Sequence, residues 1–148
     1  MPKRIFRRLG LADLALLADT KNDAEALEFY QVDEDSARLY LTNPANFFFA
    51  CVEHDKIIAY ACGYELNRVD NSGNMLYIHA VGVHADYRQL GIGKQMMTAI
   101  KHWCKVRGVG KMFLSTQKTN TAARALYDSV GGNILRGDDV TYFFSDFD

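Results

Sequence analysis

The stretch from residue 75 to residue 105 constrains the fold most, because three signals follow one another without interruption. An apolar segment rich in β-formers occupies residues 75–83 and indicates a strand. Gly91 and Gly93 mark a turn, and from Ile92 onward apolar residues recur at helical spacing, with lysines on another face. A helix that begins at such a turn offers unpaired N–H groups and the positive end of its dipole to an anion. We therefore expect this turn to hold a phosphorylated ligand.

The remaining periodicities predict a mixed sheet with helices packed on it. We expect strands at residues 5–9, 46–52, 56–66 and 111–116, helices over 11–27, 33–43 and 120–130, and two final strands flanking the turn at Gly137-Asp138. The strands at 75–84 and 111–116 should run parallel, because a helix joins them. A ligand would then lie at their carboxyl ends.

Composition indicates one ordinary globular domain over residues 1–148. Hydrophobic residues make up 49% and charged residues 24%, a balance typical of soluble proteins. No apolar run approaches the roughly 20 residues needed to cross a bilayer, and the basic N-terminus lacks the apolar stretch of a signal peptide. We expect a cytoplasmic protein with no membrane partner. Its three cysteines should be packed, reduced thiols.

Charge is distributed unevenly along the chain. Residues 13–35 hold eight acidic side chains against one lysine, whereas residues 88–124 hold eight basic side chains and no acid. The basic segment surrounds the glycine turn and suits a polyphosphate, and the acidic segment suits a cationic second ligand. Both segments can instead be solvated helix faces. A nucleic-acid partner is not expected, because the basic residues lack interleaved aromatic residues suited to stacking.

Two motifs resemble those of a known family. Arg88-x-x-Gly91-x-Gly93 follows a strand, and Asn120-x-x-Ala123-x-x-Leu126-Tyr127 follows further along the chain. Together they resemble the GNAT superfamily of acetyl-CoA-dependent N-acetyltransferases, and the expected element order is similar over nearly the whole chain. The resemblance implies the GNAT fold, an α/β (α+β) architecture with a mixed, centrally splayed sheet and helices on both faces.

Two further segments resemble particular branches of that superfamily. The strand beginning Tyr77-Ile78 and the tail Phe144-Ser145-Asp146-Phe147-Asp148 resemble the small aminoglycoside 3-N-acetyltransferases most. The strand also resembles that of serotonin N-acetyltransferase, in which a histidine at the position of His79 serves in catalysis. Where the aminoglycoside enzymes carry an acid one residue along, this chain has Ala80, and that departure leaves the acceptor in doubt.

The resemblance implies that acetyl-CoA is the cofactor. The implied cofactor-binding residues are Val81, Gly82, Val83, Arg88, Gln89, Leu90, Gly91, Ile92, Gly93, Lys94, Asn120, Ala123 and Tyr127. Main-chain groups at 89–94 would wrap the pyrophosphate, and those of Val81 and Val83 would pair with pantetheine amides. We expect Gly82 to mark a strand bulge, although close packing is an alternative explanation. For Asn120, the alternative to a cofactor contact is a role as a helix cap alone. Met96 excludes the dinucleotide motif G-x-G-x-x-G.

His79 and Tyr127 are the expected catalytic residues. On an alternating strand Tyr77, His79, Val81 and Val83 share one face, which would place the imidazole beside the thioester carbonyl. Imidazole is a suitable base for an ammonium acceptor, directly or through water, and Glu65 is the alternative base. By resemblance the Tyr127 hydroxyl protonates the departing thiolate. The alternatives to catalytic roles are a structural, hydrogen-bonded His79 and a Tyr127 that serves only as an aromatic residue of the core.

By resemblance, the amine attacks acetyl-CoA directly, without a metal or a covalent enzyme intermediate. The expected acceptor is a small cationic amine, aminoglycoside-like or polyamine-like, facing the acidic segment. Two alternatives remain open: a peptide or protein N-terminus as acceptor, and a non-catalytic acyl-CoA-binding regulatory module. A homodimer that exchanges the final strand is an expectation from the family.

Overall fold

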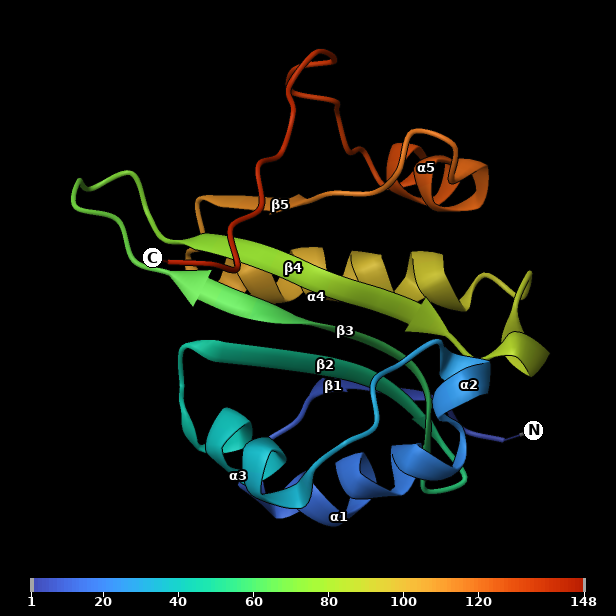
Figure 1. Ribbon diagram of the computed structural model, residues 1–148. Helices are drawn as coiled ribbons and strands as arrows, with labels where there is room; N and C mark the ends of the chain where they lie inside the picture. Colours follow the sequence, from blue (N-terminus) through green and yellow to red (C-terminus); the bar gives the residue numbers. More distant parts are fainter. Residues whose placement is uncertain (1, 148) are drawn as a thin grey trace.

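The computed structural model describes residues 2–147 and contains a single five-stranded sheet (Figure 1). The strands lie in chain order: β1 (Ile5–Arg8), β2 (Asn46–Glu53), β3 (Lys56–Leu66), β4 (Met75–Val83) and β5 (Lys111–Leu114). Neighbouring strands are antiparallel except β4 and β5, which run parallel as predicted. The parallel pair is joined through a helix, which is the connection that parallel strands require.

The hairpin between β2 and β3 also forms as predicted. His54 and Asp55 connect the strands with φ values of 52° and 57°, the two left-handed residues that match the twist of a two-residue hairpin. β3 is buried from Ile57 to Gly63, as expected for a central strand covered on both faces.

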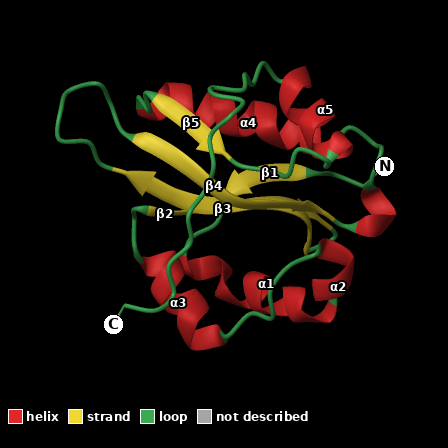
Figure 2. Cartoon of the chain, turned by 45° about the horizontal axis from the view of Figure 1, so that its top comes forward, coloured by secondary structure: helices red, strands yellow, loops and turns green. Residues whose placement is uncertain are grey.

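Helices cover both faces of the sheet (Figure 2). One face carries α1 (Leu14–Ala18), α2 (Ala24–Leu27) and α3 (Glu34–Thr42), and the other carries α4 (Ile92–Arg107) and α5 (Thr121–Ser129). Two separate hydrophobic clusters result, one under each helical layer. The predicted mixed sheet with two helical layers is therefore confirmed. No helix in the described part of the chain is long and apolar enough to cross a membrane.

The predicted helix over residues 11–27 is broken into four short pieces. Two 3₁₀ turns, η1 (Leu11–Asp13) and η2 (Asp19–Asn22), alternate with α1 and α2. Asp13 accepts a hydrogen bond from the Gly10 N–H and pairs with Arg7, so its carboxylate favours a local turn over a continuous helix. The apolar residues recur at helical spacing as predicted, but the polar residues between them interrupt the helix.

β4 and β5 separate after four residue pairs. Their register runs from Met75 opposite Lys111 to Ile78 opposite Leu114, where β5 ends. β5 is therefore two residues shorter than predicted, and residues 79–83 of β4 have no strand partner on that side. This is the central splay expected of the sheet, and it leaves the carboxyl half of β4 without a strand neighbour on that side, which we call the opening.

The last 18 described residues form no helix or strand, so the prediction of two final strands is wrong. This segment leaves α5, rises away from it and returns toward the sheet (Figure 1). Its large apolar side chains stay exposed, among them Leu135, Phe143 and Phe147. A two-stranded hairpin needs a third strand or a helix to bury its apolar face, and here the segment pairs with neither β5 nor itself.

Candidate active site

The turn between β4 and α4 has the backbone geometry of an anion-binding loop. Gln89 and Gly91 both have positive φ, 60° and 77°, and Gly91 is the N-cap of α4. A non-glycine residue in this region is uncommon. Alternation of left-handed and right-handed residues turns successive N–H groups toward one side. The first intrahelical bond runs from the Gln95 N–H to the Gly91 carbonyl, so the preceding amides remain available to a ligand.

Ile92 and Gly93 fix this loop against the rest of the protein. The Ile92 side chain is 1% exposed in the core under α4. A Cβ atom at Gly93 would lie 3.2 Å from the Leu126 side chain, so glycine there lets α5 approach the start of α4. The two sequence motifs of the family are thereby brought together. Arg88, Leu90 and Lys94 are exposed around the turn.

The bulge in β4 lies at His79 and not at Gly82. Cys62 of β3 pairs with Ala80 and the next residue, Gly63, pairs with Ile78, so His79 is the extra residue. Gly82 pairs in register with Tyr60. A Cβ atom at Gly82 would lie 2.5 Å from the Tyr60 ring and 2.6 Å from the Leu27 carbonyl oxygen. Gly82 is therefore required by close packing, which corrects the prediction of a bulge there.

The bulge changes which side chains share a face. Val81 and Val83 pack with the cluster under α4, whereas Ala80 packs with the cluster under α1–α3. The prediction that Tyr77, His79, Val81 and Val83 share one face is wrong for the two valines. An extra residue in one strand shifts the alternation by one. His79 therefore points away from the valines that border the opening.

His79 lies in an exposed patch that we call the aromatic face, made of Tyr64, Tyr77, His79 and Phe113. The Tyr77 hydroxyl is 3.4 Å from the His79 Nδ1. The Tyr77 ring stacks on Phe113 with centroids 5.0 Å apart and on Tyr64 at 6.4 Å. Sequence reasoning missed Tyr64 and Phe113 as neighbours of His79. Strand alternation alone could have placed Phe113 on the face opposite Met112 and Leu114.

Glu65 is engaged elsewhere and does not serve as the alternative base. Its two carboxylate oxygens accept hydrogen bonds from Arg107 at 2.7 and 3.0 Å. These bonds hold the pKa of Glu65 below its ordinary value, which weakens the carboxylate as a proton acceptor. A carboxylate held in two charge-assisted hydrogen bonds is a weaker proton acceptor for an incoming amine, so we do not propose Glu65 as the base.

Tyr127 lies on α5, and Asn120 is the residue that caps the start of this helix. The helix covers the face of the sheet opposite the aromatic face. Tyr127 is half-buried against the core under α4, and burial raises the pKa of its phenol. A phenol that stays protonated is a competent proton donor to a thiolate. Asn120 caps α5 by accepting a hydrogen bond from the Ala123 N–H at 3.1 Å, so its capping role is established by the structure.

The three cysteines are buried and free. Cys62 lies closest in register to the site, opposite Ala80, and burial raises the pKa of its thiol to about 12. The thiols of Cys51 and Cys104 have a pKa raised to about 11 for the same reason. Because the thiolate is the nucleophile, none of these side chains is suited to a covalent acetyl relay.

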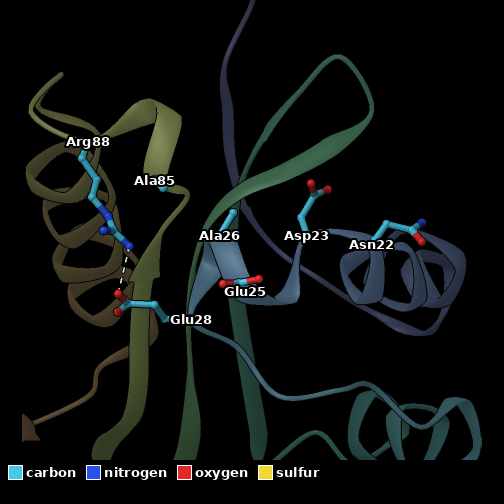
Figure 3. Close-up of a pocket in the computed structure, with 7 residues that line it drawn as sticks. All are labelled: Asn22, Asp23, Glu25, Ala26, Glu28, Ala85 and Arg88. Atoms are coloured by element: carbon cyan, nitrogen blue, oxygen red, sulfur yellow. Dashed lines mark ion pairs between the residues drawn. The ribbon is translucent and has the colours of Figure 1, made fainter.

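The acidic segment, residues 13–35, lies beside the turn between β4 and α4 at one hollow. A hollow of about 470 Å³ is lined by residues of α2 and of the turn after β4 (Figure 3). Its charged residues are Asp23, Glu25, Glu28 and Arg88. Several other acids of the segment are committed locally: Asp13 pairs with Arg7, and Asp33 caps α3. The segment is thus partly a structural surface and partly the wall of this hollow.

The fold and the loop define the class of protein: a mixed α/β domain in which a glycine turn with the geometry of an anion-binding loop follows one of two splayed parallel strands. Residues 14–131 match the acetyltransferase (GNAT) family. The chain therefore belongs to the GNAT family, whose members use acetyl-CoA.

Two curated proteins are similar to part of the chain. The ribosomal protein bS18-alanine N-acetyltransferase of Haemophilus ducreyi is 32% identical over 81 residues, which are 55% of this chain and 52% of the relative. N-alpha-acetyltransferase 50 of Danio rerio is 36% identical over 78 residues, 51% of this chain and 46% of the relative. The chain thus spans about half the length of these curated relatives.

A solved structure resembles the fold over its full length. It is an aminoglycoside acetyltransferase from an uncultured soil metagenomic sample, in complex with sisomicin. The TM-score is 0.79 with 20% identity, covering 98% of this chain and 97% of that one. At this level of identity the similarity establishes the shared fold.

Proposed function

We propose that this chain, as a single domain over residues 1–148, transfers the acetyl group of acetyl-CoA to the primary amine of a small cationic acceptor. The observation that carries the proposal is the pairing of two features at one place. The left-handed residues Gln89 and Gly91 build an amide-lined turn, and β4 loses its parallel partner after Ile78. An anion site beside an open strand suits a long cofactor with a diphosphate at one end.

The proposed cofactor contacts follow from this arrangement. Amides at 89–94 bind the diphosphate, and the main chain of Val81 and Val83 pairs with the pantetheine arm along the unpaired side of β4. Acetyl-CoA supplies an activated thioester. An N–H near Val81 would polarise its carbonyl, since a fixed amide stabilises charge that develops on oxygen.

The two residues that we propose for catalysis belong to opposite faces of the sheet: His79 lies on the aromatic face, and Tyr127 packs against the core under α4. His79 accepts a proton from the ammonium group of the acceptor, directly or through one water, so that the amine can attack. Tyr127, on the α5 side, donates its proton to the departing sulfur. A base and an acid on two sides of one opening allow the acceptor to enter from the aromatic face while the cofactor lies along β4.

A cationic acceptor is supported by the charge next to the loop. Three carboxylates, those of Asp23, Glu25 and Glu28, outnumber the single cation Arg88 in the lining of the hollow, and the excess of negative charge attracts cationic ligands. An aminoglycoside or a polyamine carries several ammonium groups, and the structural neighbour in complex with sisomicin binds a ligand of that kind. Glu65 is not part of this proposal.

A peptide or protein N-terminus is the second candidate acceptor. The two curated relatives are named as a ribosomal protein bS18-alanine N-acetyltransferase and as an N-alpha-acetyltransferase. The aromatic face supports this alternative, because Tyr64 is 38% exposed and Phe113 is 41% exposed beside His79. Exposed aromatic rings next to a base offer contact area to the side chains that follow an N-terminal amine.

The test measures thiol release from acetyl-CoA with three acceptor groups: aminoglycosides, polyamines and short peptides with free N-termini. Product masses should increase by one acetyl group for the cationic small molecules. Transfer to peptides alone would overturn the small-molecule acceptor and favour the second candidate. Tight binding of CoA with no thiol release for any amine would leave a non-catalytic acyl-CoA-binding module, and no binding at all would refute the site.

A further inference from the structure

Arg88 opens the glycine turn, yet its side chain points away from the amides that follow it. Its Nε donates a hydrogen bond to the Val83 carbonyl oxygen at 3.1 Å. Its Nη2 lies 3.2 Å from Glu28 Oε1, which Figure 3 shows as an ion pair across the hollow. The guanidinium is therefore held between the end of β4 and the end of α2.

The Val83 carbonyl faces the open side of β4. The N–H of the next residue, His84, donates to the Ile58 carbonyl on β3. Successive residues of a strand direct their main-chain groups to opposite sides. The Val83 carbonyl thus points toward the side that β5 has left, where the pantetheine arm is proposed to bind, and Arg88 already occupies it.

Glu28 presents its carboxylate from a fixed backbone. It ends α2 in the left-handed conformation, with φ 52°. Its carbonyl oxygen accepts a hydrogen bond from the Tyr60 hydroxyl at 3.1 Å, and its N–H donates to the Glu25 carbonyl. The preceding residue, Leu27, packs against Gly82. The end of α2 is therefore anchored to β3 and β4, so Glu28 restrains Arg88 from a stationary point.

We propose that Glu28 is a positioning residue that holds Arg88 on the Val83 carbonyl until acetyl-CoA enters, when the cofactor takes that carbonyl and Arg88 turns to the diphosphate. The inference rests on the proposed function. It follows that Glu28 opposes cofactor binding, because the ion pair must break before Arg88 can move. Both side chains are substantially exposed, 46% and 72%, and exposed pairs contribute little to stability. The exchange is therefore energetically accessible.

The test is the affinity of CoA for Glu28→Gln, measured by calorimetry in the absence of acceptor. We expect Glu28→Gln to bind CoA about two- to fivefold more tightly than the wild type, the range that loss of one exposed ion pair allows. Glu25→Gln is the matched control: it removes the same charge from the same hollow without the Glu28–Arg88 ion pair, and it should raise the CoA affinity clearly less than Glu28→Gln does.

A double mutant separates positioning from a general charge effect. In an Arg88→Gln background, Glu28→Gln should no longer change CoA affinity, and thermal unfolding should show that each variant remains folded. An equal increase in CoA affinity in Glu25→Gln and Glu28→Gln, or weaker CoA binding by Glu28→Gln, would overturn the inference. Neither result would contradict the proposed function. Failure of CoA to bind the wild type would overturn both.

Discussion

Arg107 binds both carboxylate oxygens of Glu65, linking the end of α4 to the end of β3 at 2.7 and 3.0 Å. The Arg107 guanidinium also lies 5.4 Å from the Trp103 ring centroid. Glu65, which the sequence offered as the alternative base, thus connects a helix to the sheet.

Glu65→Gln should lower the free energy of unfolding at pH 7 by about 1 kcal/mol while changing kcat less than twofold. Because the folded pKa of Glu65 lies below its unfolded value of 4.5, the contribution is complete above pH 4.5 and disappears as pH falls through the folded pKa. Urea unfolding of both proteins at neutral pH and at a series of pH values below 4.5 checks this. The difference between the two proteins should shrink steadily as the pH falls, and a difference that grows toward acid pH would contradict the assignment.

His79→Ala should lower kcat by about 100-fold or more, since loss of a general base typically has that effect. CoA affinity should stay within twofold, because His79 points away from the valines that border the cofactor path. Steady-state kinetics and calorimetry give the two values. His102→Ala, on the exposed surface of α4, is the control. Unchanged turnover in His79→Ala would remove this residue from the mechanism.

Tyr127→Phe should lower kcat by about 10- to 100-fold and leave KM for the acceptor nearly constant, because only the proton donor is lost while the ring still packs. Tyr30→Phe removes a hydroxyl from a side chain that is 64% exposed and should have no effect. If both variants retain full activity, the thiolate receives its proton from another source.

Gly91→Ala should weaken CoA binding by at least fivefold, because a side chain at φ 77° disturbs the amide-lined turn. Gly108→Ala provides a close match at the other end of α4, where φ is 79° and a Cβ atom would also meet open space. Both changes should cost about 1–2 kcal/mol of stability. Only the first should change CoA affinity, and an equal loss in both would indicate a helix effect and not a binding effect.

Gly82→Ala should destabilise the protein by about 1–3 kcal/mol, the usual range for overpacking, because its Cβ atom would meet the Tyr60 ring and a main-chain oxygen. Gly10→Ala has no atom within 4 Å of the added Cβ and serves as the reference in chemical denaturation. A Gly82 variant as stable as the Gly10 variant would refute the close-packing explanation.

The sequence by itself determined the elements whose signals are local. The apolar alternation and the two-residue turn specify the β2–β3 hairpin, and glycines at 91 and 108 delimit α4 because left-handed backbone favours that residue. The hairpin and the bounds of α4 depend on backbone preferences and local periodicity, so they could be recognised before the chain was folded. The splay of the sheet was instead implied by the resemblance that the two motifs carry to a known family.

Only the tertiary structure decided features that depend on a partner distant in sequence. The bulge falls at His79 because of its register against β3, and this reverses the face of every residue beyond it. Glu65 is fixed by Arg107, and Gly82 by Tyr60, each through a contact between separate elements. The final strands do not form, since alternation along one segment cannot supply the neighbouring strand that must pair with it.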